Sequence, residues 1–444
     1  MSEVHAVAVP PDVVRPGDAP PDVERYRELD GLRALAVISV FLFHIVPGAP
    51  ALFARGPDVS FELFGSTIVP PTRVFDYVFH LNVGVQVFFV LSGFLITSMY
   101  VRPWFAHEPT PEALPYAFRR AMRIFPAYGL VLFGGGVTWF GLGEIDFASP
   151  FAMIRHATLT YLYFPERWVA EFGGVDYGGL SVSWSLVAEV TFYAFVPFWM
   201  GALRWRTSRS GGASDPQAYR RAVTMAGGCI PVGVVCVFVF TYHTPWATEV
   251  PFGGLITVFG AGLVSLGAGM VLAVVVAGAS PSTRQRLRAL GERMGWWWGG
   301  AGLLLIVLAW PEFPYLQASS AQQTWQRLMQ PVIATMLVAP LVLAPGADSI
   351  VQRALRHRSL VWIGTISYGV YLWHTVVIGK LLADHPIFDR GFWGASTVVG
   401  MAAAVTVLLA AASWYLVERP LLAWSRSRFA RSKRRESSPT LADS

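Results

Sequence analysis

The chain has few charged residues and almost no cysteine. Asp, Glu, Lys and Arg make up 14% of its 444 residues, whereas an ordinary soluble domain carries about 25%. The only two cysteines, Cys229 and Cys236, lie about 10 Å apart on one expected helix, which is too far for a disulfide. The low charge argues against a set of soluble domains, and we interpret the cysteines as packing residues.

The sequence also lacks the motifs of several common enzyme classes. It contains no HExxH, no cysteine pair at metal-binding spacing, no GxSxG elbow, no Walker loop and no dinucleotide fingerprint. We therefore expect no metal site and no permanently bound cofactor.

Apolar residues are abundant instead. They account for 54% of the chain, and the mean hydropathy is +0.47. Ten segments are long enough to cross the roughly 30 Å of hydrocarbon in a bilayer. They cover about 30–50, 79–100, 125–142, 183–202, 222–242, 253–277, 294–310, 329–345, 359–382 and 394–417. These segments predict an all-α, polytopic integral membrane protein with about ten transmembrane helices.

Positive charge follows the pattern that this topology requires. If the N-terminus is cytoplasmic and each segment crosses once, 27 of the 34 Lys and Arg residues face the cytoplasm. Both termini are then cytoplasmic, and the net charge of +6 needs no nucleic-acid partner. We expect a disordered tail at 1–28, a membrane domain at 29–417 and a basic, polar tail at 418–444. The cytoplasmic stretch 203–221 is interpreted as a flexible connection.

The first apolar segment contains the ionisable residues Arg33 and His44. They lie eleven positions apart, which is about three helical turns, so both face the same side at depths roughly 16 Å apart. Ionisable groups inside a membrane indicate a functional site by default, and a neutral imidazole can take a proton from a hydroxyl. Alternatively, Arg33 only sets the topology and His44 bonds to a neighbouring helix.

Two later segments carry further polar groups at the depth of His44. Ser185 and Glu189 lie four positions apart on one helix, and Tyr371 and His374 share a face of another. A carboxylate at this depth is costly without a partner. We expect Glu189 to orient a catalytic histidine or hold an acceptor, and a purely structural partner is the alternative. Three segments thus place an ionisable residue, His44, Glu189 or His374, at the same depth, and this arrangement predicts an acid–base site.

A third group is the arginine cluster Arg119, Arg120 and Arg123, just before the third segment. Such a cluster can bind phosphates through charge-assisted contacts. It can equally bind lipid headgroups or fix the topology.

The second segment has weaker signals. Asn82 and Gln86 share one helical face, and Ser92 and Gly93 interrupt an apolar run. Small residues of this kind are usually contact points between membrane helices, and this is how we interpret Ser92 and Gly93.

Together these motifs resemble membrane acyltransferase family 3, whose members move acyl groups from coenzyme A thioesters to hydroxyls of sugars and related acceptors. The resemblance runs from about 25 to 420. Its most specific element is LDGLRALAVISVFLFH, the family's Arg-x10-His signature. The other matching motifs are GVQVFFVLSGFLIT (with Gln86 where Asp is common), RRAMRIFPAY, SWSLVAEVTFY, ISYGVYLWH and the final ERP.

The resemblance implies an integral-membrane O-acyltransferase of a bacterial-type plasma membrane, with acetyl-CoA or another acyl-CoA as donor substrate and acetyl as the expected group. Its partners would be acyl-CoA, membrane lipid and a hydroxyl acceptor, either a carbohydrate or a small natural product. Either His44 activates the acceptor directly or it becomes acylated first. The implied site residues are His44 and Glu189 for the chemistry, Arg33, Arg120 and Arg123 for the donor, and Ser185, Tyr371 and His374 for the acceptor or the oxyanion.

A transporter or flippase of a glycolipid or hydrophobic metabolite is the alternative, because buried polar groups on many spans would serve it too. The sequence shows neither internal symmetry nor a pair of plainly broken helices. A non-catalytic scaffold would leave Arg33, His44 and Glu189 unexplained.

Overall fold

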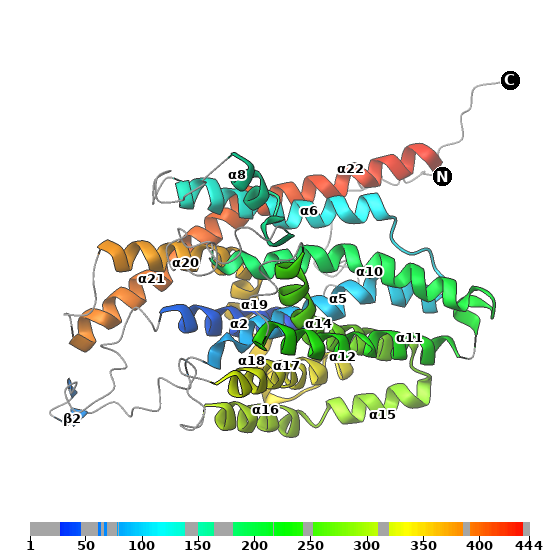
Figure 1. The fold of residues 1–444 in the computed structure, drawn as a ribbon, viewed down its shortest axis with the longest axis horizontal. Helices are drawn as coiled ribbons and strands as arrows, with labels where there is room; N and C mark the ends of the chain where they lie inside the picture. Colours follow the sequence, from blue (N-terminus) through cyan, green and yellow to red (C-terminus); the bar gives the residue numbers. More distant parts are fainter. Residues whose placement is uncertain are drawn as a thin grey trace, which may run out of the picture.

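The protein is a bundle of long helices (Figure 1). The computed structural model describes residues 27–45, 61–63, 66–68, 78, 80–137, 150–163, 181–215, 217–242, 252–309, 319–384 and 391–437. The predicted tail at 1–28 therefore lies almost wholly outside the described residues. In the described ranges, the strands are confined to one antiparallel hairpin of β1 (Phe61–Leu63) and β2 (Ser66–Ile68).

The helices occupy the apolar segments of the sequence, and most of the long ones run roughly parallel in Figure 1. The long helices are α2 (Arg27–Ile45), α5 (Val83–Phe105), α6 (Ala113–Gly129), α10 (Trp184–Ser208), α12 (Cys229–Tyr242), α14 (Gly253–Gly278), α16 (Met294–Leu308), α17 (Ser320–Leu343), α20 (Ser367–Asp384), α21 (Gly391–Ser413) and α22 (Arg419–Ser437). The short ones are α8 (Pro150–Ala157), α11 (Ala218–Gly227), α15 (Pro281–Gly291), α18 (Ile350–Leu355) and α19 (Arg358–Thr365). Single turns or π-helical stretches are η2 (His80–Asn82), η3 (Leu130–Val137), η4 (Tyr161–Tyr163), η6 (Ser181–Ser183), η7 (Gly212–Ser214) and η9 (Trp414–Glu418).

Several of these helices can cross a membrane, which makes the chain a multi-pass membrane protein. In the part of the chain that the structure describes, six are long and apolar enough: His80–Phe105, Trp184–Ser208, Ala218–Tyr242, Gly253–Gly278, Ser320–Leu343 and Ser396–Arg428. A seventh results if α19 and α20, which meet at a 69° bend, form one span. The sequence did not reveal this bend.

The other three predicted spans form helices that are shorter or more polar. Helix α2 has 19 residues and holds four charged side chains near its start, while α16 has 15 residues. The segment at 125–142 contributes the end of α6 and η3. Ten crossings and cytoplasmic termini therefore stay predictions.

Helix α5 is the central element, because α2, α10, α14 and α17 all pack against it. Its contact with α14 is close: a Cβ added to Gly93 would overlap the Leu266 carbonyl oxygen, and one added to Gly269 would overlap that of Val90. The packing interpretation of Gly93 is confirmed. The same crossing holds α5 in place beside the polar residues of α2 and α10.

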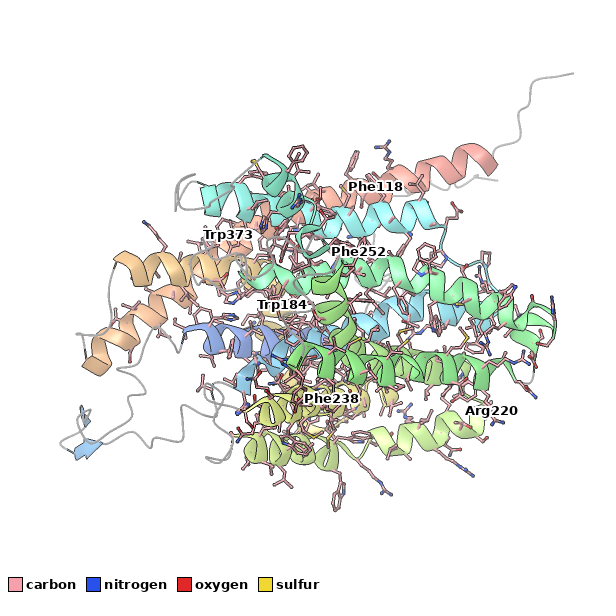
Figure 2. All side chains as sticks on the ribbon, viewed as in Figure 1. Phe118, Trp184, Arg220, Phe238, Phe252 and Trp373 are labelled. Atoms are coloured by element: carbon pink, nitrogen blue, oxygen red, sulfur yellow. The ribbon has the colours of Figure 1, made fainter. Side chains whose placement is uncertain are left out.

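The basic C-terminal segment is more than a polar tail. Residues 419–437 form α22, which lies beside α6 (Figure 1). The guanidinium group of Arg428 lies 5.7 Å from the ring centre of Phe118 on α6 and 5.5 Å from that of Trp424; Phe118 is marked in Figure 2. The contact between Arg428 and Phe118 joins α22 to the helix that carries the arginine cluster.

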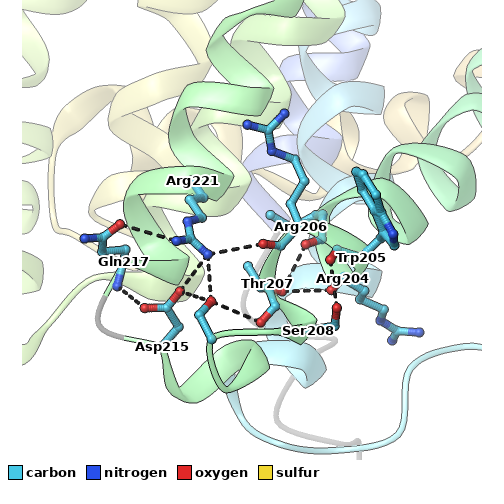
Figure 3. A network of polar contacts seen from close by, with 10 residues as sticks. Arg204, Trp205, Arg206, Thr207, Ser208, Asp215, Gln217 and Arg221 are labelled. Carbon is cyan, nitrogen blue, oxygen red and sulfur yellow. Dashed lines mark hydrogen bonds and ion pairs between the residues drawn. The ribbon is translucent and has the colours of Figure 1, made fainter.

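Polar contacts link the described residues of the connection between α10 and α11, within the stretch 203–221 that was expected to be flexible. Figure 3 shows the contacts of Asp215 with its neighbours. The carboxylate accepts hydrogen bonds from the Ser210 hydroxyl at 2.5 Å and the Gln217 backbone N–H at 2.9 Å, and pairs with Arg221 at 2.8 Å. The Ser210 and Gln217 hydrogen bonds, helped by Arg221, lower the pKa of Asp215.

Candidate active site

Arg33 and His44 of α2 line two different cavities. The helix is continuous from Arg27 to Ile45, so Arg33 and His44 share a face about 16 Å apart. The arginine cavity, of about 90 Å³, is lined by Arg33, Val85, Phe88, Phe89, Leu91, Ser92, Leu95, Ile96, Arg120, Arg123, Ile124, Ser185, Leu186, Glu189, Tyr193, Ser367, Tyr368 and Tyr371. The histidine cavity, of about 200 Å³, is lined by Phe43, His44, Asn82, Val85, Gln86, Val182, Trp184 and Tyr371.

The arginine cavity is electropositive. Three guanidinium groups against the single carboxylate of Glu189 give its lining a formal charge of +2. Asp30, which does not line the cavity, offsets the charge of Arg33 through an ion pair of 3.2 Å. Arg123 has no carboxylate within ion-pair distance among the described residues. The lining is therefore suited to an anionic ligand.

Arg120 is held in place by a hydrogen bond to sulfur and by two cation–π contacts. It donates to the Met99 sulfur at 2.8 Å, and its guanidinium carbon lies 5.7 Å and 5.3 Å from the rings of Tyr116 and Tyr193. These contacts orient the side chain without neutralising its charge. Arg119, the third member of the cluster, does not line the cavity.

Glu189 lies with the arginines and not with His44. One of its oxygens, Oε1, accepts hydrogen bonds from the Ser92 hydroxyl at 3.1 Å and from the Tyr193 hydroxyl at 2.5 Å. The structure thus differs from the expectation that Glu189 orients the His44 imidazole. Ser92, which we interpreted as a packing residue, is a hydrogen-bond donor to this carboxylate.

His44 receives its contacts from its own helix and from α20. Its Nδ1 lies 2.9 Å from the Val40 carbonyl oxygen and 3.2 Å from Nε2 of His374. His374 is completely buried and lines neither cavity. This position differs from the acceptor-binding place expected for His374.

Tyr371 lies between the two cavities and, with Val85, belongs to the lining of both. Its hydroxyl lies 2.7 Å from that of Ser185, and each of the two hydroxyls lies close enough to donate to the Val182 carbonyl oxygen, at 3.1 Å and 3.0 Å. Two hydrogens serve these three contacts. One therefore bonds to Val182 and the other joins the two hydroxyls, so neither is left for a substrate in this arrangement.

The side-chain amides of Asn82 and Gln86, to which the sequence analysis assigned no role, line the histidine cavity. The Gln86 carbonyl oxygen accepts from Ser265 at 2.7 Å, and the Asn82 carbonyl oxygen accepts from Gln330 at 2.7 Å. Their shared helical face was visible in the sequence, but their neighbours on α14 and α17 were not. Trp184, near the middle of the bundle in Figure 2, also lines the histidine cavity.

Within the described ranges, no three His, Cys, Asp or Glu side chains come together as a metal site. The polar groups of the two cavities are instead suited to binding an anion and to moving a proton.

Known proteins with related sequences include an O-acetyltransferase and an acyltransferase. The peptidoglycan O-acetyltransferase OatA of Listeria monocytogenes is 24% identical over 404 residues, which cover 88% of this chain and 55% of that protein. Nodulation protein 10 of Rhizobium leguminosarum is 26% identical, over 81% of this chain and 87% of its own. The acyltransferase MdmB of Streptomyces mycarofaciens is 27% identical, over 52% and 50%.

The chain thus spans about half the length of the Listeria enzyme. No solved structure matches it. The family model described as an acyltransferase domain matches residues 26–416, nearly the whole chain. The protein belongs to this acyltransferase family.

Proposed function

We propose that the chain moves an acyl group, with acetyl as the expected case, from acyl-CoA to a hydroxyl of a carbohydrate or a small natural product. The observation that carries this proposal is the shared wall of Val85 and Tyr371 between a cationic cavity and a cavity that holds His44. A donor bound in one cavity can meet an acceptor bound in the other at this wall. We place the chain in a bacterial-type plasma membrane, in contact with lipid.

The arginine cavity is the proposed donor site. Coenzyme A carries its phosphates at one end and its thioester at the end of a long arm. Arg120 and Arg123 would bind phosphate oxygens, with Arg33 further along the path. Glu189 would balance this charge when no donor is bound. The roughly 16 Å between Arg33 and His44 along α2 is a distance that only an extended arm spans.

His44 is the proposed general base. It takes the proton of the acceptor hydroxyl while the hydroxyl oxygen attacks the thioester carbonyl carbon. The new carbon–oxygen bond forms, the carbon–sulfur bond breaks, and the proton passes to the departing coenzyme A thiolate. In the relay variant, His44 first displaces the thiolate and then passes the acyl group to the acceptor.

The acceptor is proposed from the cavity lining and from the relatives. Trp184 and Phe43 offer flat apolar surfaces, and Asn82 and Gln86 offer amide groups that bond to hydroxyls. The Listeria relative is a peptidoglycan O-acetyltransferase, and peptidoglycan is a carbohydrate polymer. A carbohydrate hydroxyl fits both observations.

The test is transfer of radiolabelled acetyl from acetyl-CoA. Membranes containing the chain are incubated with a panel of methyl glycosides and N-acetylglucosamine disaccharides, and labelled products are separated. His44→Ala should lower transfer about 10²- to 10⁴-fold, the usual contribution of a general base. His107→Asn, an exposed histidine outside both cavities, is the matched control and should keep full activity. Full transfer by folded His44→Ala would overturn the proposal.

A transporter or flippase has one observation in its favour, the bend between α19 and α20, because broken helices form the binding sites of many transporters. The two functions differ in their products. An acyltransferase releases free coenzyme A in proportion to the acceptor added, and a transporter releases none.

A further inference from the structure

The structure joins His44 and His374 in a way that the proposed chemistry does not yet use. They are 330 positions apart in the sequence, on α2 and α20, and their ring centres lie 4.9 Å apart at an interplanar angle of 67°. Nε2 of His374 lies 3.2 Å from Nδ1 of His44. Each ring also has its Nδ1 close to a carbonyl oxygen of its own helix.

The carbonyl groups determine where the protons lie. A carbonyl oxygen only accepts hydrogen bonds, so a ring nitrogen bonded to it must carry hydrogen. Nδ1 of His374 lies 3.1 Å from the Val370 oxygen. The neutral His374 ring therefore has its proton on Nδ1 and a lone pair on Nε2, the atom that faces His44.

The same reasoning applies to His44. Its Nδ1 lies 2.9 Å from the Val40 oxygen and 3.2 Å from the lone pair of His374. Both neighbours accept, so one Nδ1–H of His44 is shared between them. The lone pair of His44 is then on Nε2, and this nitrogen is left to receive a proton.

We propose that His374 is a positioning residue that holds His44 in the Nδ1–H tautomer and so makes Nε2 of His44 the base. This inference rests on the proposed role of His44. His374 has the place that the aspartate has in a serine protease triad, where a buried acceptor fixes the tautomer and stabilises the imidazolium. A neutral ring does this here without a second charge in the membrane.

The packing around His374 supports a fixed orientation. The ring is completely buried, with Phe41 at 6.5 Å and Tyr371 at 5.8 Å between ring centres. Because the ring lines neither cavity, it does not itself contact the substrates proposed to bind there, and its hydrogen-bond partner His44 does. Tyr371 also forms the wall between the cavities, so the same packing connects the base to that wall.

The experiment compares His374→Met, which removes the acceptor atom, with His374→Gln, whose amide oxygen can accept from His44. Both are purified as the full chain and assayed with acetyl-CoA and the best glycoside of the panel. His374→Met should lower kcat about 10- to 100-fold, as when the orienting partner of a metal-bound histidine is lost. KM for both substrates should stay within about twofold, and His374→Gln should recover most of kcat.

A double variant separates this role from others. In the His44→Ala background, His374→Met should cause no further loss, because His374 acts only through His44. A raised acceptor KM with unchanged kcat would assign His374 to substrate binding and overturn the inference. Inactive but folded His374→Gln would also overturn it, and this outcome can be read even if His374→Met does not fold.

The inference and the proposed function fail in different ways. If His44→Ala is fully active, the proposed function fails. If His44→Ala is inactive and folded His374→Met is fully active, only the positioning role of His374 is refuted.

Discussion

Tyr371→Phe tests whether the wall between the two cavities acts through its ring or through its hydroxyl. In the wild-type protein, two hydrogens of Tyr371 and Ser185 make one bond to Val182 and one bond between the hydroxyls. The variant keeps the Ser185–Val182 bond and loses the other. A net hydrogen bond contributes about 0.5–1.5 kcal/mol, so the free energy of unfolding should fall by about 1 kcal/mol. No polar group is left buried without a partner.

The effect on catalysis should be small. Because the Tyr371 hydrogen is already used within the protein, kcat for acetyl transfer should fall less than about tenfold. An oxyanion donor would cost about 10²- to 10³-fold when removed. A loss of that size in folded Tyr371→Phe would refute the hydrogen-bond assignment and make the hydroxyl part of the chemistry.

Tyr371→Ala is the complementary variant, because it removes the ring that both cavities share. Truncating a buried aromatic side chain costs about 3–5 kcal/mol, so stability is measured first. With the wall removed, water gains access to the thioester. Release of coenzyme A without acceptor should therefore rise in Tyr371→Ala and stay at the wild-type level in Tyr371→Phe. Equal rates in the two variants would show that the ring is not a barrier.

Three further predictions concern the charged groups. Arg123→Ala should raise KM for acetyl-CoA about tenfold or more, since charge-assisted bonds contribute about 1.5–3 kcal/mol, whereas Arg119→Ala, outside the cavity, should change it less than about threefold. Glu189→Gln should change KM for the donor more than it changes kcat. A loss of kcat beyond about 10²-fold would show that Glu189 is a catalytic residue. Asp215→Asn should lower the thermal midpoint of unfolding at pH 7 without affecting transfer. Because the folded-state pKa of Asp215 is lowered, its stabilisation is complete above the unfolded value of about 4 and is lost as the pH falls through the folded value. The difference in thermal midpoint between the wild type and Asp215→Asn should therefore disappear at acidic pH, as measured by thermal unfolding.

The positions of the helices and the shared face of Arg33 and His44 followed from the sequence, because the hydrophobic pattern and the 3.6-residue repeat are local properties. The partners of Glu189 did not. Periodicity shows which face of α10 is polar, but the rotation of α10 against α5 determines that this face meets Ser92 and the arginines. That rotation depends on close packing such as the Gly93–Leu266 contact.

The link between His44 and His374 was missed for a similar reason. The sequence indicated that both are buried at one depth, and it suggested separate roles for them. Their contact depends on the crossing of α2 and α20, and their protonation depends on backbone carbonyl groups of Val40 and Val370. No motif records where a carbonyl oxygen points.

Helix α22 has a practical consequence for anyone who expresses this protein. By hydropathy the membrane domain ends at 417, and a fragment cut there would keep all of the residues 26–416 that the family model matches. It would nevertheless lose the helix that packs against α6, the helix that supplies two of the three arginines of the cavity. Such a fragment would insert and fold in part, yet bind the donor poorly. Truncations and affinity tags therefore belong beyond Ser437.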